Sequence, residues 1–253
     1  MKRVLVFSIA YLPFVGGAEL ALKAITDRIN DIEFDLITLR FDRALPRTEK
    51  VGNVMVHRIG FGKEKPTVEE LTRFPMYLNK ILFPFLAFFK AARLHHSRRY
   101  DAIWAMMSYA GFPAVFLKGL LPRMPFIVTL QEGDSVAHIT SRWRIRAVWP
   151  LYKLVFAKAD VIQTISHFLA DFARRMGAKC PIEVIPNGVD VKKFANGKLR
   201  IANSELKKKL GIKPEEKVVM TVSRLVEKNA VGDLIDAMSI IKSQLSKIGR
   251  AHV

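Results

Sequence analysis

The chain has 253 residues, 50% hydrophobic and 25% charged, which is a globular composition with apolar material for one or two domains. The single cysteine, Cys180, excludes an internal disulfide and is compatible with a reducing, cytoplasmic compartment. The formal net charge of +18 favours anionic partners, namely nucleic acid, acidic lipid or phosphorylated small molecules, without choosing among them.

The N-terminal segment "MKRVLVFSIAYLPFVGGA" fits two interpretations. Basic residues, an apolar run and small residues are features of a secretion signal. However, apolar residues continue after Gly16 and Gly17 at helical spacing, namely Leu20, Ala21, Ala24, Ile25 and Ile29. Because a strand, a glycine turn and a helix form one unit, we favour a buried strand over 3–9 and a helix over 19–29.

Short β-branched runs then alternate with helical stretches as far as residue 186. The predicted strands are 34–39, 54–59, 102–106, 126–131, 161–165 and 182–186, and the predicted helices are 78–94, 110–121 and 167–176. Alternation of this kind predicts an α/β fold with a doubly wound, mostly parallel, Rossmann-like sheet. Ligands of such a sheet are expected beyond the carboxyl ends of its strands.

The alternation stops in a polar, lysine-rich stretch and then restarts. We expect a first domain over 1–190, a linker with a short helix over 191–216, and the incomplete start of a second Rossmann-like domain over 217–247. This start consists of a strand at 218–225 and a helix at 230–245, fewer residues than the roughly 50 that a domain needs. The last residues, "IGRAHV", can be encoded by a common sequencing adapter, so 248–253 are expected to be a non-native tail.

Two basic, apolar stretches have the composition of membrane-surface segments. Residues 71–100 contain no acidic residue, and residues 141–159 combine five bases with two tryptophans. Cationic, aromatic, amphipathic segments bind anionic membrane surfaces, although the apolar residues of such stretches can equally face a core. Nucleic acid is a poorer fit, since no recognised binding motif is present.

Gly16 and Gly17 end the first strand without the fingerprint of a dinucleotide site. The pattern G-x-G-x-x-G is absent, and the second strand is followed by Arg40 where that fingerprint requires an acidic residue. A glycine turn at this position still lets a phosphate approach the backbone N–H groups at a helix N-terminus. An ordinary tight turn is the alternative.

Four motifs together identify a family resemblance. In chain order they are "PFVGGAE" at 13–19, "ADVIQTIS" at 159–166, "IEVIPNGVDVKKF" at 182–194 and "VSRLVEKN" at 222–229. Their order and spacing resemble the GT-B glycosyltransferases of family four, which transfer a sugar from a nucleotide sugar with retention of configuration. The resemblance implies two Rossmann-like domains across a cleft, with the acceptor mainly in the first and the nucleotide sugar in the second.

The resemblance also implies roles for individual residues. Gly16 and Gly17 match the glycine turn that approaches the donor diphosphate, and Arg224 and Lys228 match the basic pair that binds it. Fixed cations stabilise the negative charge that develops on the leaving phosphate. Asn187 is expected to shape the interdomain turn and to lie beside the donor. No metal site is expected, because the sequence shows no cluster of ligands at metal-binding spacing, and no cofactor is expected, because the nucleotide sugar is a substrate.

The sequence departs from the family pattern in two places. Many members have a histidine after the "VTL" strand, where this chain has Gln131, followed by Glu132 and Asp134 on the acceptor side. Glutamine can bind a hydroxyl but cannot act as a titrating base. The family's downstream acidic donor motif has no counterpart before Val253.

Two functions remain open on the sequence. The first is a retaining glycosyltransferase, inactive as this fragment, which transfers sugar to a saccharide or lipid-linked acceptor in the synthesis of cell envelope polysaccharide. It would be cytoplasmic and peripheral on the inner face of the membrane. The second is a non-catalytic acceptor-half module that binds an anionic lipid or saccharide.

Overall fold

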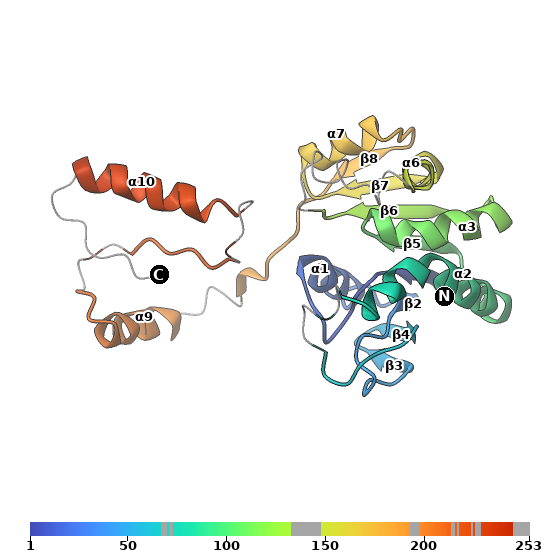
Figure 1. The fold of residues 1–253 in the computed structure, drawn as a ribbon, viewed down its shortest axis with the longest axis horizontal. Coiled ribbons are helices and arrows are strands. Elements are labelled where there is room, and N and C mark those ends of the chain that lie inside the picture. The colour runs from blue at the N-terminus through green and yellow to red at the C-terminus, as the bar shows by residue number, and fades with distance from the viewer. Residues whose placement is uncertain are drawn as a thin grey trace. The chain divides into compact units, whose positions relative to one another are not determined.

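The computed structural model describes residues 1–66, 70, 73–132, 148–192, 198–213, 216, 218–223, 225 and 229–244. The chain divides into two units, Met1–Gly188 and Val189–Val253, which we describe separately. Figure 1 labels the helices and strands of both. The predictions for Asp134, Arg224 and Lys228 fall outside the described residues.

The first unit is built on one sheet of eight strands in the order β3-β4-β2-β1-β5-β6-β7-β8. All neighbouring pairs are parallel except β3 and β4, which are antiparallel. The strands are β1 (Lys2–Phe7), β2 (Ile32–Leu39), β3 (Thr48–Val51), β4 (Val54–Ile59), β5 (Ala102–Met106), β6 (Phe126–Leu130), β7 (Val161–Thr164) and β8 (Ile182–Val184). This confirms the α/β, Rossmann-like fold predicted from the alternation of elements.

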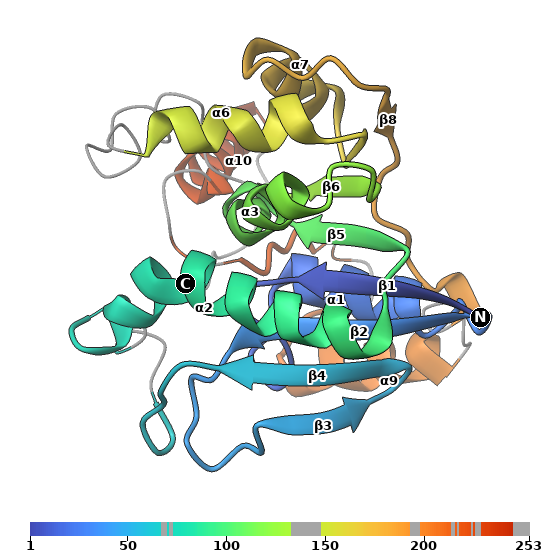
Figure 2. The same ribbon diagram turned by 90° about the vertical axis from the view of Figure 1, so that its right-hand side faces the viewer.

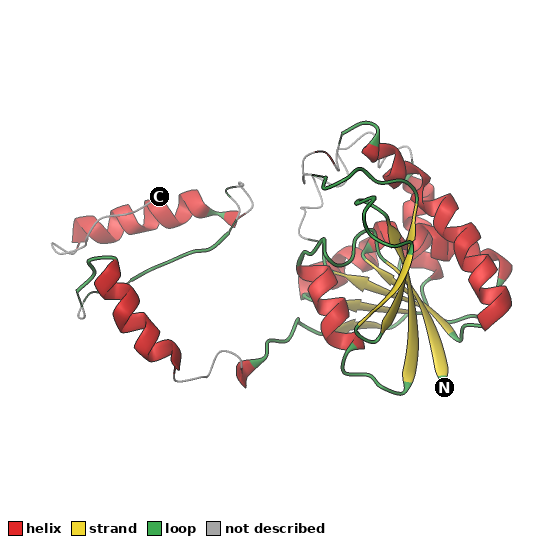
Figure 3. Ribbon diagram, turned by 90° about the horizontal axis from the view of Figure 1, so that it is seen from below, coloured by secondary structure: helices red, strands yellow, loops and turns green. Residues whose placement is uncertain are grey.

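Helices lie on both faces of this sheet, as Figures 2 and 3 show. One face packs against α1, and the other packs against a group that includes α2, α3, α6 and α7. The helices are α1 (Gly17–Thr26), α2 (Met76–Arg98), α3 (Phe112–Leu120), α6 (Trp149–Lys158) and α7 (His167–Arg175), with a short 3-10 turn at Ser108–Gly111 before α3.

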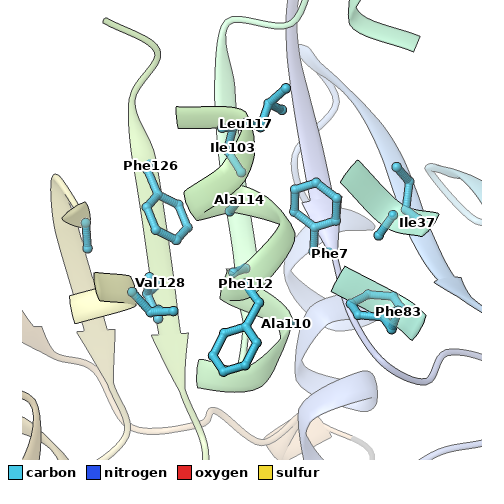
Figure 4. Close-up of a cluster of buried hydrophobic side chains, with 14 of the residues drawn as sticks. Phe7, Ile37, Phe83, Ile103, Ala110, Phe112, Ala114, Leu117, Phe126 and Val128 are labelled. Carbon is cyan, nitrogen blue, oxygen red and sulfur yellow. The ribbon is translucent and has the colours of Figure 1, made fainter. Parts of the chain in front are cut away.

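The alternation of side chains along each strand fills two cores. In β1, Leu5 and Phe7 belong to the larger core, whereas Val6 between them belongs to the core under α1. Figure 4 shows the larger core, in which Phe83 of α2 lies near Ile37 of β2. Strands buried on both faces have continuous apolar sequences, which is why they were recognisable without the structure.

A buried ionic network ties the C-terminal end of α2 to the sheet. His57 Nε2 lies 2.7 Å from Asp35 Oδ1, and Arg98 Nη1 donates to the same carboxylate oxygen at 3.1 Å. Arg98 and Arg3 both form ion pairs with Glu33, which lies two residues before Asp35 in β2. Although burial opposes ionisation, the bonds from His57 and Arg98 hold the pKa of the Asp35 carboxyl below its ordinary value.

The second unit contains the helices α9 (Lys198–Lys209) and α10 (Val231–Gln244). Helix α10 falls within the predicted helix at 230–245, and α9 is the short helix expected in the lysine-rich stretch. The strand predicted over 218–225 is not formed at 218–223 or at 225, the described residues of that segment. A strand is stabilised by hydrogen bonds to a neighbouring strand, and an apolar run by itself does not supply them.

Candidate functional site

The strand order reverses between β1 and β5, which places the topological switch point at the centre of the sheet. Chain order runs from β1 through β2 to β4 on one side and from β5 through β8 on the other. In doubly wound sheets, ligands bind in the crevice outside the carboxyl ends of the strands at this point. The segments that follow β1, β5 and β6 are therefore the place to look for functional side chains.

The segment after β1 leads to Gly16 and Gly17 at the start of α1. The Gly16 N–H donates to Glu19 Oε2 at 2.6 Å, so this carboxylate caps the helix. A Cβ added to Gly17 would meet no atom within 4 Å, and neither glycine has a positive φ. The structure therefore has room for a side chain at residue 17, and glycine is less favourable in a helix than alanine. Neither packing nor helix stability explains a glycine at this position. A glycine in this position leaves the first N–H groups of α1 open to a ligand.

The segment after β5 is held in a strained turn by β6. Met107 has a φ of +72°, which is costly for a residue with a side chain. Its N–H donates to Thr129 O at 2.8 Å, and the Ser108 N–H donates to Glu132 Oε1 at 2.5 Å. The Ser108 hydroxyl lies 2.9 Å from the Tyr152 hydroxyl. Strain stabilised in this way, at the switch point, marks a candidate binding surface.

Glu132 combines burial with an unused hydrogen-bonding atom. Its Oε2 is buried and has no partner in the described part of the chain. Burial raises the pKa of the Glu132 carboxyl, against the hydrogen bonds from Ser108. Burial and this carboxylate also raise the pKa of Tyr152. Glu132 is thus suited to bind a donor such as a hydroxyl, or to carry a proton itself.

Gln131 and Asn187 form a reciprocal amide pair across 56 residues of sequence. Gln131 Nε2 donates to Asn187 Oδ1 at 3.0 Å, and Asn187 Nδ2 donates to Gln131 Oε1 at 3.1 Å. The pair joins the segment after β6 to the segment after β8, where Gln163 of β7 also donates to Ile185 O. These bonds fix the shape of the carboxyl edge on that side of the sheet.

A cavity of about 450 Å³ opens at the same edge, beside β2 and β4. It is lined by Arg43, Phe61, Gly62, Lys63, Glu64, Pro75 and Met76. Lys63 pairs with Glu70, and a Cβ on Gly62 would lie 2.8 Å from the Arg43 nitrogen and the Phe41 oxygen. The cavity thus combines an exposed aromatic ring with two basic side chains and the acidic side chain of Glu64.

Several of the residues predicted to form the site lie at one edge of the sheet. Gly16 and Gly17 lie at the switch point, and Gln131, Glu132 and Asn187 lie along the neighbouring carboxyl ends. The sequence did not identify Ser108 or Tyr152. Ser108 could have been found from the sequence, since it closely follows a predicted strand, where ligands of such a sheet bind. Tyr152 lies in a helix, and no sequence pattern indicates it.

The family model described as "Glycosyl transferase 4-like domain" matches residues 28–188. No curated protein sequence gives a significant match to the chain. Solved structures give broad matches at low identity. Sucrose-phosphate synthase from Thermosynechococcus elongatus is 18% identical with a TM-score of 0.69, covering 95% of this chain and 60% of its own.

Two further matches have the same character. HepE of Anabaena in complex with UDP is 21% identical with a TM-score of 0.64, covering 95% of this chain and 58% of its own. The UDP-forming trehalose-phosphate synthase of Burkholderia xenovorans is 16% identical with a TM-score of 0.64, and the match covers 96% of this chain and 61% of the synthase. These likenesses concern the fold. The chain thus spans about 60% of the length of these three proteins.

Proposed function

Because the chain belongs to the family of glycosyl transferase 4-like domains and has the fold of a GT-B glycosyltransferase, we propose that it forms the acceptor side of an enzyme that transfers a sugar from a nucleotide-diphosphate sugar with retention. The observation that carries this proposal is the family match over 28–188. The open glycine turn at Gly16 and Gly17 precedes the matched residues and lies at the switch point of the same sheet. The structures of HepE with UDP-glucose and with UDP support a nucleotide sugar as donor.

The leaving diphosphate is the chemical centre of the proposed reaction. As the bond between sugar and phosphate breaks, negative charge develops on the phosphate oxygens. We propose that the open N–H groups at the start of α1 bind these oxygens and that Arg224 and Lys228 supply cations. The acceptor hydroxyl would give its proton to the leaving phosphate, so this mechanism requires no separate base and no cofactor.

The acceptor is proposed to bind along the carboxyl edge of the first unit. Gln131 and Glu132 offer hydrogen-bonding groups there, and Asp134 is proposed to act with them. The cavity beside Arg43 and Phe61 adds a basic and aromatic surface. We propose a saccharide or lipid-linked acceptor of envelope polysaccharide synthesis, and a cytoplasmic enzyme on the inner face of the membrane.

A second candidate function is binding without catalysis. The chain spans about 60% of the length of the matched synthases. The described part of the predicted site consists of the acceptor-side groups Gln131 and Glu132, the glycine turn and Asn187. An acceptor-half module would bind an anionic lipid or saccharide and would not consume nucleotide sugar. On the first proposal, the chain by itself is expected to transfer little sugar, and activity is expected from a complete two-domain enzyme.

The test is nucleoside diphosphate release from a panel of nucleotide sugars, measured on the 253-residue chain and on the complete gene product. Release by the complete gene product that depends on added acceptor supports the transferase. Full activity of the chain alone would contradict the two-domain mechanism. If no donor is consumed by either protein while saccharide or lipid is bound, the binding module replaces the enzyme.

A further inference from the structure

Helix α2 has two apolar faces, of which the first unit covers only one. Its buried residues follow helical spacing and face the sheet, and they are Met76, Asn79, Phe83, Pro84, Ala87 and Ala91. A second apolar stripe follows the same spacing on the opposite side. It consists of Leu78, Ile81, Leu82, Phe85, Leu86 and Phe89, all of which are exposed. A surface helix normally presents charged and polar residues on that side.

This second stripe, the α2 outer stripe, consists entirely of exposed apolar side chains. Phe89 is 67% exposed and Phe85 is 54% exposed. Phe85 stacks on Phe116 of α3 with ring centroids 5.7 Å apart, and Leu120 at the end of α3 is 63% exposed. The stripe thus continues onto α3 and forms a contiguous apolar area. Areas of this kind on a protein surface mark interaction sites.

The charge around the outer stripe is uniformly positive. No acidic residue occurs between Leu71 and Tyr100. Four and seven residues after Phe89, the same helix face continues as Arg93 and His96, both exposed, with Lys90 beside it. The occupant of this surface must therefore be both apolar and anionic. Two copies of the chain would bring like charges together, which disfavours self-association through this face.

The other basic stretch does not offer a comparable surface in its described part. Residues 141–147 lie outside the described residues. In α6, Tyr152, Val155 and Phe156 are buried in the core, and Trp149 stacks on Tyr152. Val148 and Leu154 are exposed, at 37% and 40%, so the described part of this stretch presents two large exposed apolar side chains where the outer side of α2 presents six.

We infer that the α2 outer stripe, with Phe116 and Leu120 of α3, is the face by which this protein lies on an anionic membrane. The inference rests on the proposed peripheral location and specifies the surface that produces it. None of the described helices has the length and apolarity to cross a bilayer. Instead, the apolar face enters the boundary between headgroups and acyl chains, and Lys90 and Arg93 bind lipid phosphates. An acceptor carried by a lipid would then reach the protein from this side.

The test is co-sedimentation of the 253-residue chain with vesicles of equimolar phosphatidylglycerol and phosphatidylcholine, and with vesicles of phosphatidylcholine alone. We expect binding to the mixed vesicles that weakens with salt. The variant Phe85→Ser/Phe89→Ser should bind at least about tenfold more weakly, since inserted aromatic side chains supply much of the affinity. Lys90→Glu/Arg93→Glu should lose the preference for phosphatidylglycerol.

The matched control is Leu20→Ser/Ile25→Ser in α1, which removes two apolar side chains with exposed fractions of 54% and 39% and should bind like the wild type. Circular dichroism confirms that each variant is folded.

Equal binding by the Phe85→Ser/Phe89→Ser variant overturns the inference. So does a lipid-free dimer that this variant dissociates, because the face would then join two copies. A transferase that turns over without binding vesicles overturns only this inference. Vesicle binding by a protein without transferase activity overturns only the proposed function.

Discussion

Replacement of Gly17 by alanine tests whether this glycine is needed for the stability of the fold or for the binding of a ligand. Gly17 is the first residue of α1, and an added Cβ would meet no atom within 4 Å. The substitution therefore fits the structure and lowers the entropy of the unfolded chain. We expect a gain of about 0.4–1 kcal/mol in the free energy of unfolding, which raises Tm by roughly 1–4 °C in a unit of this size.

The same methyl group should impair catalysis. It would stand where the proposed diphosphate approaches the helix amides, and a hydrogen bond to a charged group contributes about 1.5–3 kcal/mol. We therefore expect kcat/KM for the nucleotide sugar to fall about 10- to 100-fold. The control is Gly119→Ala in α3, where an added Cβ also meets no atom within 4 Å. That variant should gain stability in the same way and keep full activity.

The two measurements are thermal unfolding of the 253-residue chain by circular dichroism and steady-state release of nucleoside diphosphate by the active enzyme. A Gly17→Ala variant with wild-type kcat/KM would refute the approach of a ligand to this turn. A variant that loses stability as well as activity would show that Gly17 serves the fold, and the argument from open space would then fail.

Three further predictions concern charged side chains. Arg224→Ala should lower turnover about 100-fold, by analogy with loss of one preorganised donor at an anion site, whereas Lys192→Ala should be neutral in the same kinetic assay. Because the folded pKa of Asp35 is lowered, its stabilising effect is present above the ordinary pKa near 3.9 and is lost as pH falls through the folded value. Asp35→Asn should cost about 1.5–3 kcal/mol in urea unfolding at pH 7, since Arg98 loses its buried carboxylate, and should flatten that acid dependence. Glu132 has a raised pKa, so its ionisation destabilises the fold as pH rises above about 4.3, and Glu132→Gln should remove this slope from pH-dependent unfolding curves.

The sheet was predictable because most of its strands are buried on both faces, and the exceptions have physical reasons. The strand β3, "TEKV", is polar and pairs with β4 alone at the edge, so its sequence carries no apolar pattern and it was missed. Helix α2 was expected over 78–94 and extends over Met76–Arg98. The polar residues at its C-terminal end are stabilised there by contacts of Arg98 with the sheet, which the helical periodicity does not contain.

The positions of the candidate residues were predictable, whereas their contacts were not. Gln131 could be placed at a carboxyl end because it follows a strand. Its pairing with Asn187 depends on the order of β6, β7 and β8 in space, which the chain sequence does not specify. The contact of Glu132 with Ser108 depends in the same way on the register of β5 against β6. A single sequence contains the residues of a site but not the registers that bring them together.

The two edges of the sheet bear on how this protein aggregates. An exposed strand edge offers unpaired backbone groups to a second chain. Here β3 has four residues and carries Glu49 and Lys50, and β8 has only three residues. Short or charged edges are poor templates for further strands. Addition of strands from a second chain at either edge is therefore disfavoured, so in concentrated solution the native sheet should not grow into cross-β fibrils.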